Sequence, residues 1–583
     1  MLALALLLTA TALPQAPVPA TRAIRVSLDR PDPADWAELR AAVGAAGAGL
    51  RWEPALRQAR APEDRPLILF VQEGEAAGED GPVGPGDLLL LRAGERLELS
   101  APVAALGFTP AAPLPAGLPA RIRPDFDPRV TDTPGGCASA AGAYRRICLT
   151  WEEAKGPYVY RGLNAHRVRI RDSLTHFHPR AGGFDELYLV QDALPGAALI
   201  VGERLDDLLH PERLDRAAAA GLLREIPLRR GDLVLLPRGV AHRGIGGVLA
   251  QVIALPGFVP GAEIPLDDAI AAVNERFDLE LPRHVPDTPF VAVVEQADRV
   301  RIEIGDTLCT EYRFAAGPRA FFHPFLLADG RALTRGFPFE PRPGESRDHP
   351  HHQGIWLAHG SVDGIDFWHD PEVEQRLIAI EEAFSRPGRG GFTTRHEWRA
   401  PDGRVVLRDR RRFTFTAAPG GERWLDADLL LIAPPDRPVR FGDTKEGTFA
   451  VRLAAPLRVE GEVATGTLLD SAGRRDGAVW GRRARWIAAS GRIDGRPASL
   501  GLLELPGSFR SPTWWHARTY GLEAANPFGR HDFEGAPPGT GDFTLDPGGE
   551  LRLRYRVVAS PAVWPTFVDP DGDGEPGPAP AGG

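Results

Sequence analysis

Two blocks of residues in the first half of the chain recur further along in the same order, and this recurrence restricts the fold more than any other feature. PLILFVQEGE (66–75) is repeated as DELYLVQDA (185–193), and GDLLLLRAGERLEL (86–99) as GDLVLLPRGVAHRGI (231–245). Each block is a short apolar run bounded by turn residues, as is typical of β-strands. The repeated order indicates an internal duplication, so this region is expected to form two related β-rich halves.

Only the second half carries residues suited to binding a metal ion. His176 and His178 form an HxH pair in THFH, Glu186 opens the strand block ELYLV, and His242 follows the PRG segment at 237–239. Alternate side chains share one face of a strand, so the HxH pair points both imidazoles the same way. The PRG turn would return His242 to the same interior. Three histidines and one carboxylate leave open positions on Fe, Mn, Ni, Cu or Zn.

These residues resemble the two motifs of the cupin family, whose members hold a divalent metal inside a small β-barrel. The resemblance implies that residues 131–265 are a metal-type cupin half, with one divalent ion on His176, His178, Glu186 and His242. A cupin that has lost its metal is the alternative.

The first half, residues 22–130, lacks these ligands. Arg92 and Leu97 stand where the second half has Pro237 and His242, and no histidine precedes His166. We expect a degenerate, metal-free cupin half that packs against the active one, so that residues 22–265 form a bicupin.

The second half of the chain is marked by DHPHHQGIWLAHGSVDGIDFW (348–368), which holds four of the fifteen histidines. Pro350 disfavours a helix and restricts the backbone of His349. The segment is therefore expected to begin extended, with His349 and His351 on one face and His352 on the other.

Further blocks follow in order: RAFFHPF with LTRGFP (319–338), GDTKEGTFAVRLA (442–454), AVWGRRARWIAASG (478–491) and SPTWWHARTYGLEAANPFG (511–529). Together they resemble a bacterial family of unknown function named "methane oxygenase PmoA". The resemblance implies a β-rich domain over residues 286–567. Particulate methane oxygenase is an integral membrane enzyme, whereas this half has no run of eighteen apolar residues that could span a membrane. The family name is therefore not taken as the function.

These blocks place polar residues in predicted loops between predicted strands, where catalytic and binding sites commonly lie. The predicted catalytic residues are Asp348, His349, His351, His352, Lys445, Glu446 and His516, and the predicted substrate-binding residues are Arg335, Trp356, Trp368, Trp514, Arg518 and Asn526. A histidine base suits proton transfer near neutral pH. A metal held by the same histidines is the rival interpretation. The third interpretation is a solvent-exposed polar loop without function, with the tryptophans packed in the core.

The remaining segments complete the predicted organisation. Residues 1–20 are typical of a signal peptide, which favours a periplasmic or secreted protein. Cys137 and Cys148 could pair there or remain free thiols. Residues 266–285 predict a helical linker, and residues 568–583 a disordered Pro/Gly-rich tail. The predicted fold class is all-β, with a double cupin barrel followed by a β-sandwich-like domain.

Three functions remain open at this point. The first is an exported hydrolase or lyase acting on a glycoside or modified sugar, with the cupin as an auxiliary metal-binding part. The second is a metal-dependent oxygenase or isomerase centred on the cupin, and the third is a sugar-binding protein without catalysis. A net charge of −10 argues against nucleic acid, so the expected partner is a small molecule or glycan.

Overall fold

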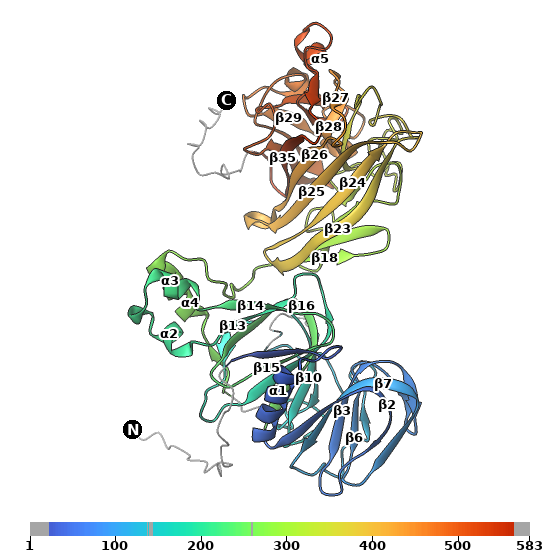
Figure 1. Cartoon of the computed structure of the whole chain (residues 1–583). Helices are drawn as coiled ribbons and strands as arrows, with labels where there is room; N and C mark the ends of the chain where they lie inside the picture. Colours follow the sequence, from blue (N-terminus) through green and yellow to red (C-terminus); the bar gives the residue numbers. More distant parts are fainter. Residues whose placement is uncertain (1–21, 137, 139–143, 258–260, 565–583) are drawn as a thin grey trace. The chain divides into compact units, whose positions relative to one another are not determined.

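The computed structural model describes residues 22–136, 138, 144–257 and 261–564 (Figure 1). It divides into two compact units, Met1–Pro286 and Asp287–Gly583, each built mainly of β-strands. The all-β prediction is confirmed. The predicted signal peptide, the predicted tail and Cys137, whose pairing with Cys148 the sequence leaves open, lie outside the described residues. Among those that are described, no helix is long and apolar enough to cross a membrane.

The described residues of the N-terminal unit form seventeen strands, with short helices between some of them. The strands are β1 (Ile24–Ser27), β2 (Ala48–Arg60), β3 (Leu67–Glu73), β4 (Ala76–Gly78), β5 (Gly81–Val83), β6 (Leu88–Leu91), β7 (Arg96–Pro110), β8 (Arg121–Ile122), β9 (Arg145–Leu149), β10 (Asn164–Asp172), β11 (His176–Phe177), β12 (Asp185–Ala193), β13 (Ala198–Gly202), β14 (Arg224–Pro227), β15 (Asp232–Leu236), β16 (Ala241–Leu255) and β17 (Ile264–Pro265). The helices are α1 (Pro33–Ala45), α2 (Leu205–Leu209), α3 (Arg216–Ala220), α4 (Asp267–Phe277) and a 3₁₀ turn at Pro211–Arg213.

The two halves of this unit share one pattern of strand pairing. The first half pairs in the order β2–β7–β3–β6–β8, and the second in the order β10–β16–β12–β15–β1. The GD turns match as well: Gly86 and Gly231 have φ of +93° and +85°, and the Asp87 and Asp232 carboxylates each accept a backbone N–H three residues back. The duplicated order is the double cupin arrangement that the repeated blocks predict.

The halves also exchange equivalent hydrogen bonds. The Gln72 side chain donates to the carbonyl of Val190 over 2.7 Å, and the Gln191 side chain donates to the carbonyl of Val71 over 3.1 Å. A shared apolar cluster includes Phe70 from the first half and Leu187 from the second. Buried amides that bond across the contact satisfy backbone groups that would otherwise be costly to bury.

The predicted linker is part of the N-terminal unit. Helix α4 buries Ile270 and Val273 in an apolar cluster with Leu205 and Leu208 of α2. The segment between β13 and β14 contains α2, the 3₁₀ turn and α3, and residues of α2 and α3 share this cluster with Ala241 of β16. The helical segment 267–277 is therefore a packed element of this unit.

Up to Trp564, the last residue that the structure describes, the C-terminal unit contains eighteen strands. They are β18 (Phe290–Glu295), β19 (Arg299–Ile304), β20 (Thr307–Arg313), β21 (Phe321–Phe325), β22 (Ile355–His359), β23 (Glu374–Pro387), β24 (Arg389–Arg399), β25 (Val405–Ala417), β26 (Arg423–Ile432), β27 (Val439–Phe441), β28 (Gly447–Arg452), β29 (Thr467–Asp470), β30 (Trp486–Ile493), β31 (Arg496–Glu504), β32 (Trp514–Arg518), β33 (Leu522–Asn526), β34 (Phe543–Leu545) and β35 (Glu550–Ser560). The helical turns are α5 (Arg530–Glu534) and 3₁₀ turns at Pro419–Gly421, Ala455–Leu457 and Asp476–Val479.

Sixteen of these strands form one continuous sheet, from β29 through β35, β26–β23 and β18–β22 to β28, β33 and β32. One core joins its two arms, with Val293 and Phe322 from one arm packed in the same cluster as Phe413, Leu429 and Tyr555 from the other. A sheet that closes on its own apolar face in this way is sandwich-like. Cys309 is a buried free thiol in β20.

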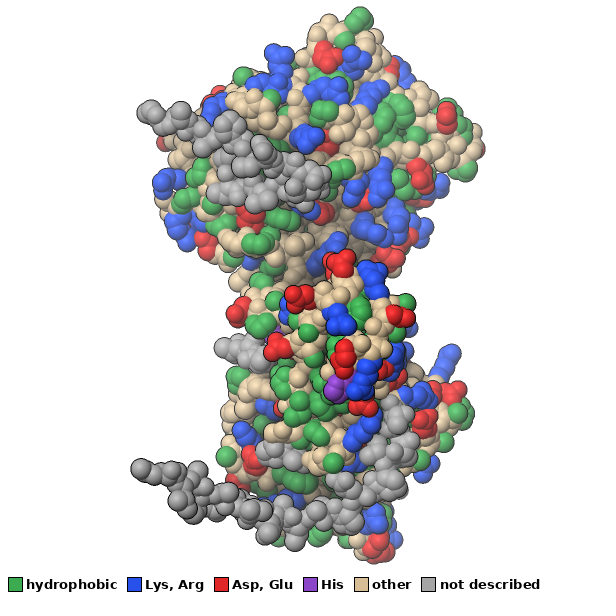
Figure 2. Space-filling view, turned by 90° about the vertical axis from the view of Figure 1, so that its left-hand side faces the viewer, with side chains coloured by type: hydrophobic (Ala, Val, Ile, Leu, Met, Phe, Trp, Pro, Cys, Tyr) green, Lys and Arg blue, Asp and Glu red, His purple; other side chains and the backbone are tan. Residues whose placement is uncertain are grey.

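Charged side chains cover the outer face of the long strands β23–β26 and β35. They pair across strands, as Glu381 does with Arg410 at 2.7 Å and Asp426 with Arg556 at 2.5 Å. On the face shown in Figure 2, basic and acidic side chains are interspersed over the surface. Exposed pairs of this kind add little stability but keep a sheet face soluble.

Candidate metal centre

The four predicted metal ligands meet at one end of the second cupin half. His176 lies in β11, His178 follows it, Glu186 is in β12 and His242 is in β16. The Cα atoms of His176 and His242 are direct partners in antiparallel pairing. A turn precedes His242, in which Gly239 has φ of +85° and donates its N–H to the carbonyl of His178 over 2.8 Å. The HxH strand and the PRG turn thus bring distant residues together, as predicted.

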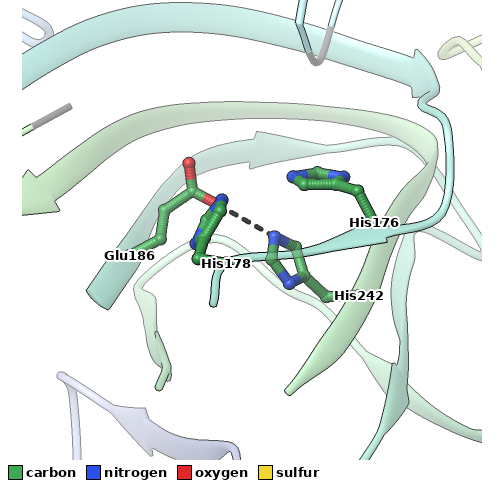
Figure 3. A group of neighbouring side chains, drawn as sticks. All are labelled: His176, His178, Glu186 and His242. Atoms are coloured by element: carbon green, nitrogen blue, oxygen red, sulfur yellow. Dashed lines mark ion pairs between the residues drawn. The ribbon is translucent and has the colours of Figure 1, made fainter. Parts of the chain in front are cut away.

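The four side chains offer ligand atoms that all lie within 4.8 Å of one another, and all four residues are buried (Figure 3). Nε2 of His176, Nε2 of His242 and Oε2 of Glu186 have no hydrogen-bond partner among the described residues. Buried polar atoms without partners are rare and call for an explanation. The site is the only such group of three or more ligand residues in the described part of the chain.

Backbone carbonyls set the tautomers of two of the imidazoles. Nδ1 of His176 lies 3.2 Å from the carbonyl of Leu174, and Nδ1 of His242 lies 3.0 Å from the carbonyl of Val240. Because a carbonyl can only accept, each Nδ1 carries the proton and each Nε2 presents its lone pair to the centre. This arrangement is the one that metal-ligating histidines use. The residues present therefore fit a divalent metal.

Burial controls the protonation of the site. It lowers the pKa of His176 and of His242 to about 4. It raises the pKa of Glu186 to about 7, while the charges of His176 and Arg145 act in the opposite direction. Oε2 of Glu186 lies 3.2 Å from Nε2 of His242. A cation in the centre would favour the ionised carboxylate and the neutral imidazoles, so metal binding and proton release are coupled.

The metal-free protein is expected to lose stability as the pH falls from 6.5 towards 4. The unfolded chain binds protons on His176 in this range and the folded chain does not, so each such histidine costs about 1.4 kcal/mol per pH unit. Glu186 opposes this effect because its folded-state pKa is raised. Urea denaturation of chelator-treated protein at several pH values measures the slope. The variant His176→Gln should show a slope smaller by about one proton; an unchanged slope would contradict the account.

A cavity of about 330 Å³ lies directly beside the centre. Glu186 lines it, and so does Phe184, which stacks on His178 with ring centroids 3.8 Å apart. Two further polar residues of β10, Asn164 and His166, face the same space. The cavity gives a small molecule room next to the predicted ligands, since its volume falls within the usual range of ligand sites.

His166 was not predicted as a site residue. It is buried, and neither ring nitrogen has a hydrogen-bond partner among the described residues. Burial lowers its pKa well below the ordinary value, and the charge of Arg145 acts in the same direction. The alternation of Asn164 and His166 in a strand that precedes the HxH pair was the available signal.

Comparison with known protein families finds a match in the second half of the chain. Residues 299–566 match the model of a family of unknown function (DUF6807). No curated protein matches the chain. Because the matched family has no assigned function, the PmoA-type name inferred from the sequence blocks stays a prediction.

Several solved structures are similar to parts of the chain, and those described here are cupin-fold proteins. A salicylate 1,2-dioxygenase from Pseudaminobacter salicylatoxidans is 15% identical, with 36% of this chain and 70% of that one covered, at a TM-score of 0.23. An oxalate decarboxylase from Lactobacillus farciminis is 13% identical, covering 40% and 86%, at 0.25. An IolB-like protein from Salmonella typhimurium is 14% identical, covering 39% and 89%, at 0.26. At these scores the likenesses carry no argument about activity.

Three of the four predicted catalytic histidines of the C-terminal unit, His349, His351 and His352, also lie together. The ring of His352 is 4.8 Å from that of His349 and 4.5 Å from that of His351. It also contacts Trp356 and Trp368, at 5.3 Å and 5.7 Å. We name these five residues the His–Trp cluster. They do not form a group of close ligand atoms of the kind found in the cupin half, among the residues described.

The expectation that this segment begins extended is wrong. His349 has φ of +44°, and the carbonyl of His349 accepts the N–H of His352 over 3.0 Å. Pro350 is the second residue of this tight turn, where its fixed φ is favoured. The turn brings all three imidazoles together, whereas an extended chain would separate them onto two faces.

Arginines hold this turn in place. Arg335 is buried and donates to the carbonyls of Asp348, His349 and His352. Arg452 donates to the Asp348 carboxylate over 3.1 Å. Arg335 therefore anchors the loop through backbone groups, which differs from the substrate contact predicted for it.

His369, which was not predicted, connects the cluster to Lys445 and Glu446. Its ring lies 4.7 Å from that of His351, and its Nε2 is 4.0 Å from the Glu446 carboxylate. The Lys445 ammonium is 3.6 Å from the same carboxylate. These contacts join segments that are far apart in the sequence.

Other predicted residues of this unit support the loop that carries Lys445. His516 is buried and its Nδ1 donates to the carbonyl of Lys445 over 2.9 Å. The Asn526 amide donates to the carbonyl of Thr444 over 2.8 Å. Burial lowers the pKa of His516 to about 4, so it is neutral at ordinary pH. Both residues act on the backbone of the loop.

The last two predicted substrate-binding residues, Trp514 and Arg518, are not members of the His–Trp cluster. Trp514 is buried and its indole donates to Glu534 over 3.0 Å. The Arg518 guanidinium lies over the ring of Tyr520 at 5.6 Å, and that ring stacks on His349. Arg518 is thus close to the cluster, while the indole N–H of Trp514 is already occupied.

The hydrolase interpretation gains no support from Asp348. Burial is the largest single influence on the pKa of this carboxyl and acts to raise it, but the Ser346 hydroxyl, the charge of Arg452 and the contact with His349 together outweigh burial and hold the pKa below its ordinary value. Glycoside cleavage needs one carboxylic acid that keeps its proton near neutral pH. Asp348 is ionised there, so it is unsuited to that role.

Proposed function

We propose that the chain is a metal-dependent enzyme acting on a small molecule, with its reaction centre in the second cupin half and of the oxygenase or isomerase class. The observation that carries this proposal is the convergence of three buried imidazoles and one buried carboxylate beside a cavity, with Nε2 of His176, Nε2 of His242 and Oε2 of Glu186 lacking a hydrogen-bond partner among the described residues. A divalent metal such as Fe or Mn, when bound, would supply Lewis acidity and open coordination positions.

The chain's own residues prepare the site for such chemistry. The carbonyls of Leu174 and Val240 hold two imidazoles in the ligating tautomer. Behind the centre the barrel is filled by apolar side chains that include Val168, Tyr188 and Val252, which exclude water from that side. Because apolar side chains fill the barrel on one side of the centre and the cavity lies on the other, substrate would approach from the cavity.

The test compares metal-free protein with protein reloaded separately with Fe(II), Mn(II) or Zn(II). Each sample is screened with a panel of small carboxylates, hydroxy acids and keto-sugars, with oxygen uptake and product formation recorded. We expect turnover that requires one of the metals and is lost in His178→Ala. Turnover that is equal in the metal-free protein, or that survives this substitution, would contradict the proposal.

A further inference from the structure

The cavity beside the metal centre contains two opposite charges that are not paired with each other. Arg145 in β9 and Glu263, just before β17, both line it. Within the described residues, no hydrogen bond or ion pair holds either side chain, and Nε of Arg145 is buried without a partner. An arginine and a glutamate so close to a buried centre would ordinarily be paired, because an unpaired charge is costly there.

Both charges border the same small space. A Cβ atom built on Gly136 would lie 3.4 Å from Nη2 of Arg145 and 3.6 Å from Oε1 of Glu263. Gly136 has φ of +55°, so a side chain is disfavoured there on backbone grounds as well. The glycine keeps this space clear between the two charged ends.

The charges line the same cavity as Glu186, one of the four predicted metal ligands. The charge of Arg145 acts on Glu186 and on His166, whereas the charge of Glu263 acts on His176 and His242. A molecule bound between Arg145 and Glu263 would therefore be held next to the predicted metal position. The apolar side chains of Ile147, Phe184 and Ala254 line the rest of the cavity.

The chemistry of the two groups defines a ligand. Guanidinium binds carboxylates through two parallel N–H···O bonds, and a carboxylate accepts hydrogen bonds from hydroxyl groups. From this geometry we infer that the cavity takes a small carboxylate that also carries a hydroxyl group. The carboxylate binds Arg145, and the hydroxyl donates to Glu263. This inference rests on the proposed function, for which it names the substrate class.

The test uses L-malate and succinate, which differ by one hydroxyl group, and measures their binding by titration calorimetry. In the wild-type protein malate is expected to bind more tightly than succinate. Arg145→Gln should weaken both by about tenfold or more, because each loses a charged hydrogen bond. Glu263→Gln should remove the advantage of malate and leave succinate unchanged. The matched control is Arg161→Gln, an exposed cation outside the cavity lining, which should change neither affinity appreciably.

Two results would overturn the inference. One is the absence of binding of either acid to the wild type at concentrations on the order of 10 mM, where even weak sites are occupied. The other is equal binding by the wild type and Arg145→Gln. All titrations are run with and without metal, and metal content is measured afterwards. A protein that binds malate but takes up no metal when metal is offered would contradict the proposed function alone. A metal-loaded protein that binds neither acid would contradict this inference alone.

Discussion

Replacing Arg411 by methionine is expected to lower the free energy of unfolding of the C-terminal unit by about 3–5 kcal/mol. Arg411 and Asp409 form an ion pair at 2.6 Å, and both side chains are almost completely buried. Burial would raise the pKa of Asp409, but the charge of Arg411 and the hydrogen bonds from Arg411 and His396 hold it below its ordinary value. Without Arg411 this carboxylate loses its main counter-charge while it stays in the core.

No other group in this network can replace the positive charge of Arg411 beside Asp409. Nδ1 of His396 donates to Asp409 over 3.0 Å, and the hydroxyl of Tyr312 lies 3.1 Å from Nε2 of His396. The indole of Trp398 donates to Asp409 over 2.6 Å. Burial lowers the pKa of His396, so the imidazole is neutral and cannot replace the cation. His396, Tyr312 and Trp398 already form hydrogen bonds within the network, and none of them carries a positive charge.

The neighbouring residue Arg412 provides a matched control. It pairs with Glu382 at 3.4 Å on the surface, where both side chains are more than half exposed. Arg412→Met is expected to change stability by less than about 1 kcal/mol. Chemical denaturation of the full chain, followed by tryptophan fluorescence, compares the two variants. Equal losses for Arg411→Met and Arg412→Met would show that the buried network contributes no more than a surface pair.

The second large effect is expected at the metal centre. Replacing His178 by alanine should reduce metal affinity by more than about tenfold, since even the loss of residues that only orient ligands costs that much. The variant removes one of the four ligand side chains that converge in the barrel. Metal is measured by mass spectrometry after dialysis against a weak chelator, with circular dichroism to verify the fold.

His166→Gln is the control for this experiment. His166 is a buried imidazole of the same barrel, but it is not part of the ligand group. It should keep its metal. Equal metal content in His178→Ala and the wild type, or equal loss in both variants, would contradict the assignment of ligands.

The metal ligands could be predicted from the sequence because each is fixed by local structure. The HxH pair needs only the alternation of a strand, and His242 needs only the turn at Gly239, whose positive φ a glycine adopts readily. The duplicated halves could be predicted for the same reason, since a GD turn and an apolar run describe one strand and its entry.

Arg145, His166 and Glu263 were missed because nothing local connects them. They lie in β9, in β10 and just before β17, and only the packing of the barrel places them around one cavity. A charge in a sequence also gives no sign of whether a partner will reach it.

The C-terminal unit shows a different limit. The turn that begins at His349 depends on the carbonyl of that residue and on the buried Arg335, and neither influence is visible in the sequence pattern. His516 and Asn526 act on backbone carbonyls of the 444–445 loop, a role that side-chain chemistry alone does not indicate.

The most direct test of the central claim is an anomalous-scattering measurement on crystals of the full chain purified without chelator. Data collected on both sides of the absorption edge of the metal found in solution identify and locate the ion. The account predicts one strong peak within ligand distance of Nε2 of His176, Nε2 of His242, a ring nitrogen of His178 and the carboxylate of Glu186. An empty centre in metal-replete protein, or a peak placed only elsewhere in the chain, would contradict it.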